Sequence, residues 1–282
     1  MAGRKSSPVE VGNVISLDHV NFRVSDQRLA ILFFLEGLGL TRDPYRMTGT
    51  GNMWVNIGSQ QFHLPTTGPT PFPGEVGLIV PNLEDVRRWL KRVAPKLKGT
   101  DFSWKDGKAA IATQDPWGRR IRVHPAGSLP AMMNLALAYV ELWVPPGSSA
   151  AIGDFYEQVL EVPVQRNGAS KSPRVEVTMG PHQFMRFVET ADAPTFGHNN
   201  HVAVYLTRYQ EVYARMAKLR ILMEKDRFEQ FRFNRILNLK TGKCLMEFEH
   251  EMRSLYHGDC GRPLVNRGDI GGRLGRVIGR ET

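Results

Sequence analysis

A repeated pattern of strand, turn and strand is the feature of this sequence that most constrains its fold. The segment NMWVNIGSQQFHLP (52–65) alternates apolar and polar residues around a short turn, and VEVTMGPHQFMRFVET (175–190) does the same. The two segments match at a glycine, a glutamine and a phenylalanine: Gly58, Gln61 and Phe62 in the first, Gly180, Gln183 and Phe184 in the second. Alternation with a period of two is typical of half-buried strands. His63 does not repeat, because Met185 takes its place. We therefore interpret the shared frame as fold and the histidine as chemistry.

The same order of predicted elements occurs four times along the chain. Each unit begins with an alternating strand, continues with a helix and ends with two or three strands. The first strands of the units are SLDHVNFRV (16–24), EVGLIV (75–80), LAYVELWV (137–144) and NNHVAVYL (199–206). Asn82 is expected to cap the second helix, LEDVRRWLKRVAPKL (83–97). The sequence thus predicts an α+β fold of four βαβββ units.

A single βαβββ unit cannot bury its sheet face alone, so the units should pair into half-barrels with a cup on the inner side. We expect units that follow one another in the chain to pair. The predicted domains are residues 14–127 and residues 134–256, each made of two units. A basic tail rich in glycine and arginine, residues 257–282, follows them.

Composition places limits on the class of protein. Hydrophobic residues make up 41% of the chain, yet no apolar run approaches the ~20 residues of a membrane span. Cys244 and Cys260 form neither a disulfide framework nor a metal motif, which favours a reducing, cytoplasmic location. The start of the chain lacks a secretory signal, while import into an organelle remains open. The net charge of +9 lies partly in the tail, which we interpret as solvated, so no nucleic acid is expected as a partner.

Several segments together carry a resemblance to a known family. They are LDHVNFRV, FFLEGLGL, FHLP, DPWGRRIRV, FYEQVLEV, NNHVAVYL and LMEFEHE, in the order of the four units. The chain resembles the vicinal oxygen chelate superfamily, which includes glyoxalase I, extradiol dioxygenases and bleomycin-resistance proteins. The resemblance implies glyoxalase/dioxygenase-like half-barrels that hold a divalent metal ion in the cup. It also implies that the ligands come from the first and last strands of paired units.

Carrying these positions over one at a time gives a candidate set for each expected domain. In the first domain they fall on His19, His63, Glu75 and either Arg122 or His124. In the second domain they fall on Tyr139 with Glu141 beside it, on Met185, on His201, and on Glu247 or Glu249. The residues with metal-binding chemistry are His19, His63, Glu75, His124, His201, Glu249 and Glu141. The resemblance further suggests Glu75 and Glu249 as catalytic carboxylates, and Arg122, Tyr139 and Tyr205 as substrate-binding residues.

Two imidazoles and a carboxylate would suit Fe, Mn, Ni or Zn. Two residues oppose this interpretation. The guanidinium of Arg122 would repel a cation, although it could hold an anionic substrate. Tyr139 stands where an extradiol dioxygenase would carry a histidine. His19 and His63 could instead be inward-facing polar residues that are satisfied by hydrogen bonds.

The leading hypothesis is a metal-dependent enzyme of this type, a lyase, isomerase or dioxygenase acting on a small oxygen-bearing organic molecule. The alternative is a metal-free protein that sequesters a ligand, as bleomycin-resistance proteins do. A third interpretation is an interaction scaffold in which the basic tail matters most. Two domains in one chain are compatible with a monomer or with a homodimer.

Overall fold

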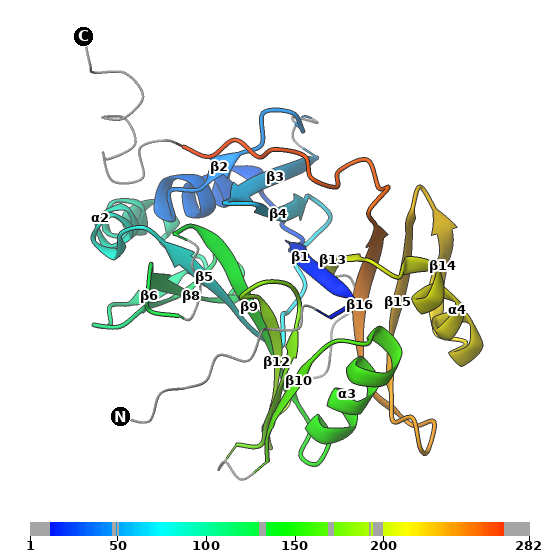
Figure 1. Ribbon diagram of the computed structural model, residues 1–282. Coiled ribbons are helices and arrows are strands. Elements are labelled where there is room, and N and C mark those ends of the chain that lie inside the picture. The colour runs from blue at the N-terminus through cyan, green and yellow to red at the C-terminus, as the bar shows by residue number, and fades with distance from the viewer. Residues whose placement is uncertain are drawn as a thin grey trace.

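The computed structural model describes residues 12–46, 49, 51–129, 134–168, 172–191, 193 and 200–267. In this part of the chain, sixteen strands form two eight-stranded mixed sheets (Figure 1). The expected α+β fold is confirmed. No helix among the described residues is long and apolar enough to cross a membrane.

The first sheet combines strands from both ends of the chain. Its N-terminal strands are β1 (Val14–Asn21), β2 (Thr41–Arg42), β3 (Asn52–Ile57) and β4 (Gln60–Pro65). Its C-terminal strands are β13 (His201–Leu206), β14 (Leu222–Arg227), β15 (Gln230–Leu237) and β16 (Cys244–Ser254). The order across the sheet is β14-β15-β16-β13-β1-β4-β3-β2.

The second sheet is built from the middle of the chain. The strands of the second unit are β5 (Gly74–Val80), β6 (Ser103–Lys105), β7 (Ile111–Gln114) and β8 (Arg120–Pro125). Those of the third unit are β9 (Ala136–Val144), β10 (Val164–Asn167), β11 (Arg174–Thr178) and β12 (Phe184–Glu189). The order is β10-β11-β12-β9-β5-β8-β7-β6, which repeats the pattern of the first sheet.

The units do not pair in the way that the sequence suggested. The sequence predicted that the two units within residues 14–127 would share one sheet and that the two units within residues 134–256 would share the other. Instead the first unit shares its sheet with the fourth, and the second with the third, through the antiparallel pairs β1 with β13 and β5 with β9. The physical reason is that all four first strands present similar apolar edges, so the repeat itself does not specify which of them meet. The residue boundaries of the two domains stay a prediction.

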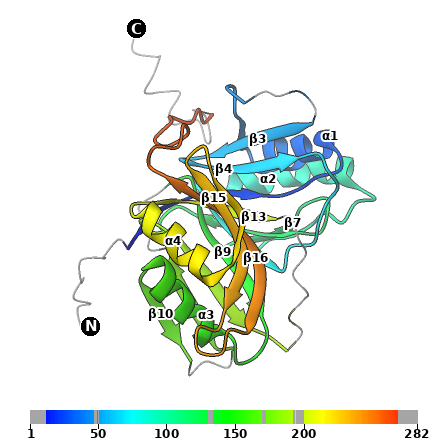
Figure 2. The ribbon, with the colours of Figure 1, turned by 90° about the vertical axis from the view of Figure 1, so that its right-hand side faces the viewer.

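The helices follow the first strand of each unit. They are α1 (Gln27–Ala30), which continues as the π-helical η1 (Ile31–Gly37), α2 (Leu83–Val93) with the 3-10 turn η2 (Ala94–Leu97), α3 (Ser149–Phe155), which continues as the π-helical η3 (Tyr156–Leu160), and α4 (Tyr209–Leu219). The Asn82 side chain accepts a hydrogen bond from the Glu84 backbone N–H at 2.9 Å, so the predicted cap of α2 is confirmed. Helix α2 packs against η1, and α3 touches a strand of each sheet, β11 and β15. Figure 2 shows α3 and α4 side by side.

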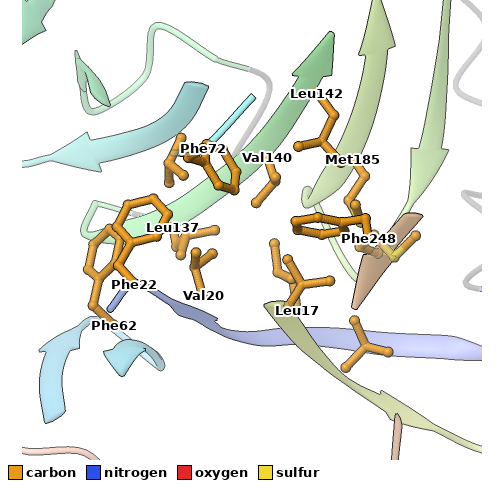
Figure 3. Close-up of a cluster of buried hydrophobic side chains, with 14 of the residues drawn as sticks. Leu17, Val20, Phe22, Phe62, Phe72, Leu137, Val140, Leu142, Met185 and Phe248 are labelled. Atoms are coloured by element: carbon orange, nitrogen blue, oxygen red, sulfur yellow. The ribbon is translucent and has the colours of Figure 1, made fainter. Parts of the chain in front are cut away.

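The hydrophobic core lies between the two sheets. Figure 3 shows Leu17 and Val20 of β1 close to Leu137 and Val140 of β9, and all four are fully buried. An irregularity in the pairing of β1 between Leu17 and His19 allows both Leu17 and Val20 to face this core. The side chain of His19 therefore lies on the opposite face of the first sheet.

The segment that follows β16 ties the fourth unit to the first. Figure 1 shows this segment, in orange and red, running past β3 and β2. The Val265 carbonyl accepts from Asn56 Nδ2 at 2.8 Å, and Arg262 Nη2 donates to Asp43 Oδ2 at 2.6 Å. Part of the predicted basic tail, residues 257–267, is thus packed against the first unit, while residues 268–282 lie outside the described residues.

A buried ion pair joins the second unit to the first. The side chain of Arg119 is 1% exposed, and its Nε donates to Asp115 Oδ2 at 2.7 Å. Its Nη1 donates to the Arg23 carbonyl at 2.6 Å, which fixes the loop after β1. Removing one partner of a buried pair leaves an uncompensated charge.

We expect Arg119→Met to lower the free energy of unfolding by about 3–5 kcal/mol, because Asp115 would stay buried without its partner. The neighbouring Arg120 is exposed, so Arg120→Met should cost less than about 1 kcal/mol. Chemical denaturation of the two variants measures both values. Equal losses would contradict the structural role given to Arg119.

Candidate metal site

Three histidines from three strands of the first sheet converge. His19 lies on β1, His63 near the end of β4 and His201 at the start of β13, and one ring nitrogen of each lies within 4.8 Å of the others. The closest pair is His19 Nε2 and His201 Nε2, 3.4 Å apart. The convergence follows from the register, in which His201 lies opposite Asn21, two residues after His19.

Carboxylates next to Nδ1 of His19 and of His201 favour a proton on that nitrogen of each ring. His19 Nδ1 lies 2.8 Å from Asp18 Oδ2, and His201 Nδ1 lies 3.4 Å from Glu249 Oε1. Protons on the two Nδ1 atoms leave the two Nε2 lone pairs facing each other. Such an arrangement is repulsive unless a cation lies between them. Two imidazoles bound tetrahedrally to one ion with bonds of 2.0–2.1 Å would have nitrogens about 3.3 Å apart.

His63 offers a further nitrogen to the same place. Its Nε2 is buried and has no hydrogen-bond partner, whereas its Nδ1 lies 2.9 Å from Asn21 Nδ2. Turning the Asn21 amide by 180° lets its oxygen accept from Nδ1–H and leaves the Nε2 lone pair for a ligand. Burial lowers the pKa of His63 to about 3, with repulsion by His19 as the second cause, so the ring is neutral near pH 7. Trp54 stacks on this ring at a centroid distance of 4.0 Å.

The symmetry of the first sheet identifies a fourth member. Val20 and Val202 face each other where β1 and β13 pair, and His19 and His201 precede them. One residue after Val20, Asn21 is level with His63 on β4, and the equivalent residue after Val202, Ala203, is level with Glu251 on β16. Glu251 thus holds the position equivalent to His63. We call His19, His63, His201 and Glu251 the histidine site.

Glu251 is a buried carboxylate between two guanidinium groups. Arg253 Nε donates to Glu251 Oε1 at 2.6 Å, and Arg232 Nη2 donates to Oε2 at 2.5 Å. Oε2 also lies 3.7 Å from His201 Nε2. Burial alone would raise the pKa of Glu251, but Arg253, followed by the histidines and Arg232, holds it well below the usual range. Glu251 is therefore ionised and lies beside His201.

Arg253 links this carboxylate to the residues around it. Its Nη1 donates to Asp18 Oδ2 at 3.0 Å, and Asp18 in turn accepts from His19. The same nitrogen lies 3.4 Å from the Tyr205 hydroxyl and 3.5 Å from Asp259 of the C-terminal segment. One buried arginine thus orients groups on both sides of the histidine site.

The donor set fits a divalent transition-metal ion. Neutral imidazoles and a carboxylate are ligands that suit Zn, Fe, Mn or Ni, whereas Ca and Mg prefer oxygen ligands alone. The partnerless Nε2 of His63 and the 3.4 Å between the Nε2 atoms of His19 and His201 are the specific observations behind this fit.

The second sheet has different residues at the equivalent positions. Val76 faces Val140 where β5 and β9 pair, so the residues that precede them, Glu75 and Tyr139, correspond to His19 and His201. Gly77 is level with Arg122 on β8, and Glu141 is level with Arg186 on β12. Four residues of the second sheet thus occupy the positions of the histidine site: Glu75, Arg122, Tyr139 and Arg186. We call them the arginine site.

Hydrogen bonds join the residues of the arginine site to one another and to their neighbours. Arg122 donates to both oxygens of Glu75, from Nε at 2.7 Å and from Nη2 at 2.9 Å. The Tyr139 hydroxyl donates to Glu75 Oε1 at 3.0 Å, and His124 Nε2 lies 3.2 Å from that hydroxyl. Arg186 Nη1 donates to Glu141 Oε2 at 3.0 Å.

The structure therefore divides the predicted site residues between two places. It brings His19, His63 and His201 together, with Glu249 behind His201 and Tyr205 beside Arg253. The other predicted residues lie in the second sheet, away from the three histidines: Glu75, Arg122, His124, Tyr139 and Glu141.

Two of the site positions assigned from the family resemblance were shifted along their strands. Met185 is fully buried in the core (Figure 3), and the next residue, Arg186, holds the equivalent position. The turn before β12 has five residues, 179–183, whereas the turn before β4 has two, 58–59, and His182 in the longer turn has a positive φ of 58°. In the fourth unit, the equivalent position is Glu251 rather than Glu247 or Glu249. A shift in register decides which side chain reaches a site.

Comparison with known proteins agrees with this architecture. Glyoxalase I from Zea mays superposes with a TM-score of 0.62 at 15% identity, over 86% of this chain and 93% of that chain. A putative dioxygenase from Bacillus subtilis superposes with a TM-score of 0.53 at 11% identity, over 90% and 92%. The chain has the vicinal oxygen chelate fold. No protein-family model and no curated protein sequence matches it.

Three residues in or beside the histidine site were not predicted from the sequence: Glu251, Asp18 and Arg253. Glu251 stands in the alternating run LMEFEHE, in which three glutamates share a spacing of two. That alternation signals a face of β16 but does not say which of its glutamates is level with His201. Asp18 adjoins His19 in the sequence, and a carboxylate beside a candidate metal-binding histidine was the signal available for it.

We expect Asp18→Asn to weaken metal binding about 10- to 100-fold, because the carboxylate that orients His19 would be lost. Glu75→Gln changes a buried carboxylate of the second sheet and should leave metal affinity unchanged. Titration with Zn or Mn, monitored by calorimetry, measures both affinities. Equal weakening in the two variants would contradict the assignment of the ion to the histidine site.

Proposed function

We propose that this chain is a metal-dependent enzyme of the vicinal oxygen chelate type that acts on a small oxygen-bearing organic molecule. Its reaction would be that of a lyase, isomerase or dioxygenase. The observation that carries the proposal is the convergence of three imidazole rings, with His19 Nε2 3.4 Å from His201 Nε2 and with the buried His63 Nε2 lacking a hydrogen-bond partner. A purely structural cluster would pair such nitrogens with donors instead.

His19, His63 and His201 would hold the ion, and Glu251 would supply the carboxylate of the site. A divalent ion there would polarise a pair of substrate oxygens and stabilise the anion that forms on them. We assign the carboxylate role to Glu251 in place of Glu249 and Glu75. Glu249 faces the Nδ1 side of His201, and Glu75 belongs to the other sheet.

Tyr205 is a candidate for contact with the substrate. Burial raises the pKa of its hydroxyl, with Asp18 as the second cause, so the group keeps its proton. Arg253 Nη1 donates to the Tyr205 oxygen, which leaves the hydroxyl proton available for a substrate oxygen. Such a donor would favour an oxygen on which negative charge develops.

Trp54 and Arg46 cover the histidine site on one side. The Arg46 guanidinium lies 4.4 Å from the centroid of the Trp54 ring, which stacks on His63. Arg46 also forms an ion pair with Asp259 of the C-terminal segment. These contacts would exclude water from one face of the bound ion and strengthen electrostatic interactions there.

The solved relatives are compatible with this proposal. One is named as a glyoxalase I and the other as a putative dioxygenase. At identities of 15% and 11% they support the fold, while the proposed chemistry rests on the residues of the histidine site.

Metal content is the first test. We expect protein purified without chelators to carry about one ion per chain, and His63→Ala and His201→Ala to lose it. His124→Ala is the matched control, since it removes a histidine from the second sheet, and it should retain the ion. Elemental analysis measures all four proteins.

If the wild type binds none of Fe, Mn, Ni or Zn after incubation with each, the metal mechanism is rejected. The chain would then be assigned to the alternative class, proteins that sequester a ligand without metal. If His124→Ala loses the ion and the other two variants keep it, the site has been placed in the wrong sheet.

The role of the carboxylate gives a second test. Once a substrate has been found among 1,2-diols, 2-oxo acids and hemithioacetals, Glu251→Gln should lower kcat by roughly 10² or more. Glu249→Gln should lower it by a smaller factor, because Glu249 acts through His201. Steady-state kinetics on metal-loaded protein distinguishes the two, and the reverse order would show that Glu249 is the catalytic carboxylate.

A further inference from the structure

The residues of the histidine site are closed off from solvent. The side chain of His19 is 1% exposed, that of His201 is 6% exposed and that of Glu251 is 3% exposed. A substrate whose oxygens bind an ion held by these residues has to come into direct contact with the site. Some part of the chain around the site must therefore move to admit it. This inference rests on the proposed function, because it concerns how a substrate enters that site.

The segment after β16 crosses the face of the first sheet that carries the histidine site. We call residues 255–267 the strap; it runs from the end of β16 past β3 and β2 (Figure 1). Near its start, Asp259 Oδ2 lies 3.5 Å from Arg253 Nη1, and the ring of His257 lies 6.3 Å from that of Tyr205. Arg253 and Tyr205 both lie beside the histidine site, so the strap begins against one side of it.

The strap then reaches the other side of the same face. Asp259 also forms an ion pair with Arg46, whose guanidinium lies over the Trp54 ring that stacks on His63. Asn56 follows Trp54 by two residues on β3, so its side chain lies on the same face of the sheet. Its Nδ2 donates to a backbone carbonyl of the strap at 2.8 Å. The strap thus spans the histidine site from its C-terminal strands to its N-terminal strands.

Polar contacts hold the strap in place. None of its residues is buried, none lies in a helix or a strand, and none belongs to the hydrophobic core. Arg262 Nη2 donates to Asp43 Oδ2 at 2.6 Å, and the side chain of Asp43 has no exposed surface. Gln61 donates to the same oxygen at 2.7 Å, so Asp43 keeps a partner when Arg262 moves away. A segment with so few apolar contacts opens more readily than the sheet beneath it.

We propose that the strap is a movable cover of the histidine site, held shut by the ion pairs of Arg262 with Asp43 and of Asp259 with Arg46 and Arg253. In the closed state it excludes water from the site. Opening breaks these polar contacts and admits the substrate, while the strands that carry the metal-binding residues keep their register.

The test measures how fast individual histidines of the metal-free full chain react with diethyl pyrocarbonate, a reagent that modifies neutral imidazoles. Peptide mass spectrometry resolves each position. Two histidines of the chain serve as references. His182 is exposed and reports the activity of the reagent. His250 on β16 is fully buried and bonded to the Tyr156 hydroxyl at 2.6 Å, so it reacts only when the protein unfolds.

The variants assign the opening to the strap. In the wild type, His19 and His201 should react far more slowly than His182. In Arg262→Gln their rates should rise at least about tenfold, because the loss of a charge-assisted hydrogen bond raises the population of the open state. Asp259→Asn should act in the same direction, and it decides the question if Arg262→Gln does not fold.

The matched control is an arginine far from the strap. Arg166 also pairs with two carboxylates, Asp154 and Glu157, but on the second sheet. Arg166→Gln should leave the rates of all the histidines unchanged. His250 should stay unreactive in this variant and in both strap variants, which separates local opening from global unfolding.

Three results would overturn the proposal. If His19 and His201 react as fast as His182 in the wild type, the site is already open. If their rates are the same in the wild type and in the folded strap variants, the strap is not the cover. If His250 speeds up as much as they do, the strap serves global stability alone. These rates are measured without metal, so failure here leaves the proposed enzyme standing, whereas a wild type that binds no metal rejects the enzyme without changing the rates.

Discussion

The antiparallel pairing of β1 with β13 is the contact on which the candidate site depends. His19 and His201 are 182 residues apart in the chain, and this pairing brings their Nε2 atoms to 3.4 Å. The outer strands β4 and β16 then add His63 and Glu251 at equivalent positions. The C-terminal segment is held against the first unit by the ion pair between Arg262 and Asp43. A change in the register of this one pairing would move His19 and His63 away from His201 and Glu251.

The two sheets show how one scaffold supports two kinds of chemistry. In the first, buried imidazoles and a carboxylate form a set of donors that suits a divalent metal ion. In the second, the residues equivalent to His63 and Glu251 are Arg122 and Arg186, which supply the positive charge themselves. Glu75 is satisfied by Arg122 and by the Tyr139 hydroxyl.

The sequence was enough to predict the α+β fold, because strand alternation and helix capping are local signals. The family resemblance also suggested His19, His63 and His201 as candidate ligands, but it assigned His201 to a different domain from the other two, whereas the structure brings all three together. Pairing of the units was not predictable, since it depends on which apolar edges meet in three dimensions. Glu251 was missed for a related reason: three glutamates alternate along β16, and only the register with β13 decides which is level with Ala203.

Anomalous X-ray diffraction from crystals grown with Mn or Zn tests the central claim most directly. The account predicts one strong anomalous peak per chain, between the Nε2 atoms of His19, His63 and His201, and no peak beside Glu75. A peak at Glu75 would contradict the account, and so would an ion bound through Glu249 with the three histidines uninvolved. Either result would mean that the convergence of imidazoles in the first sheet serves packing and not metal binding.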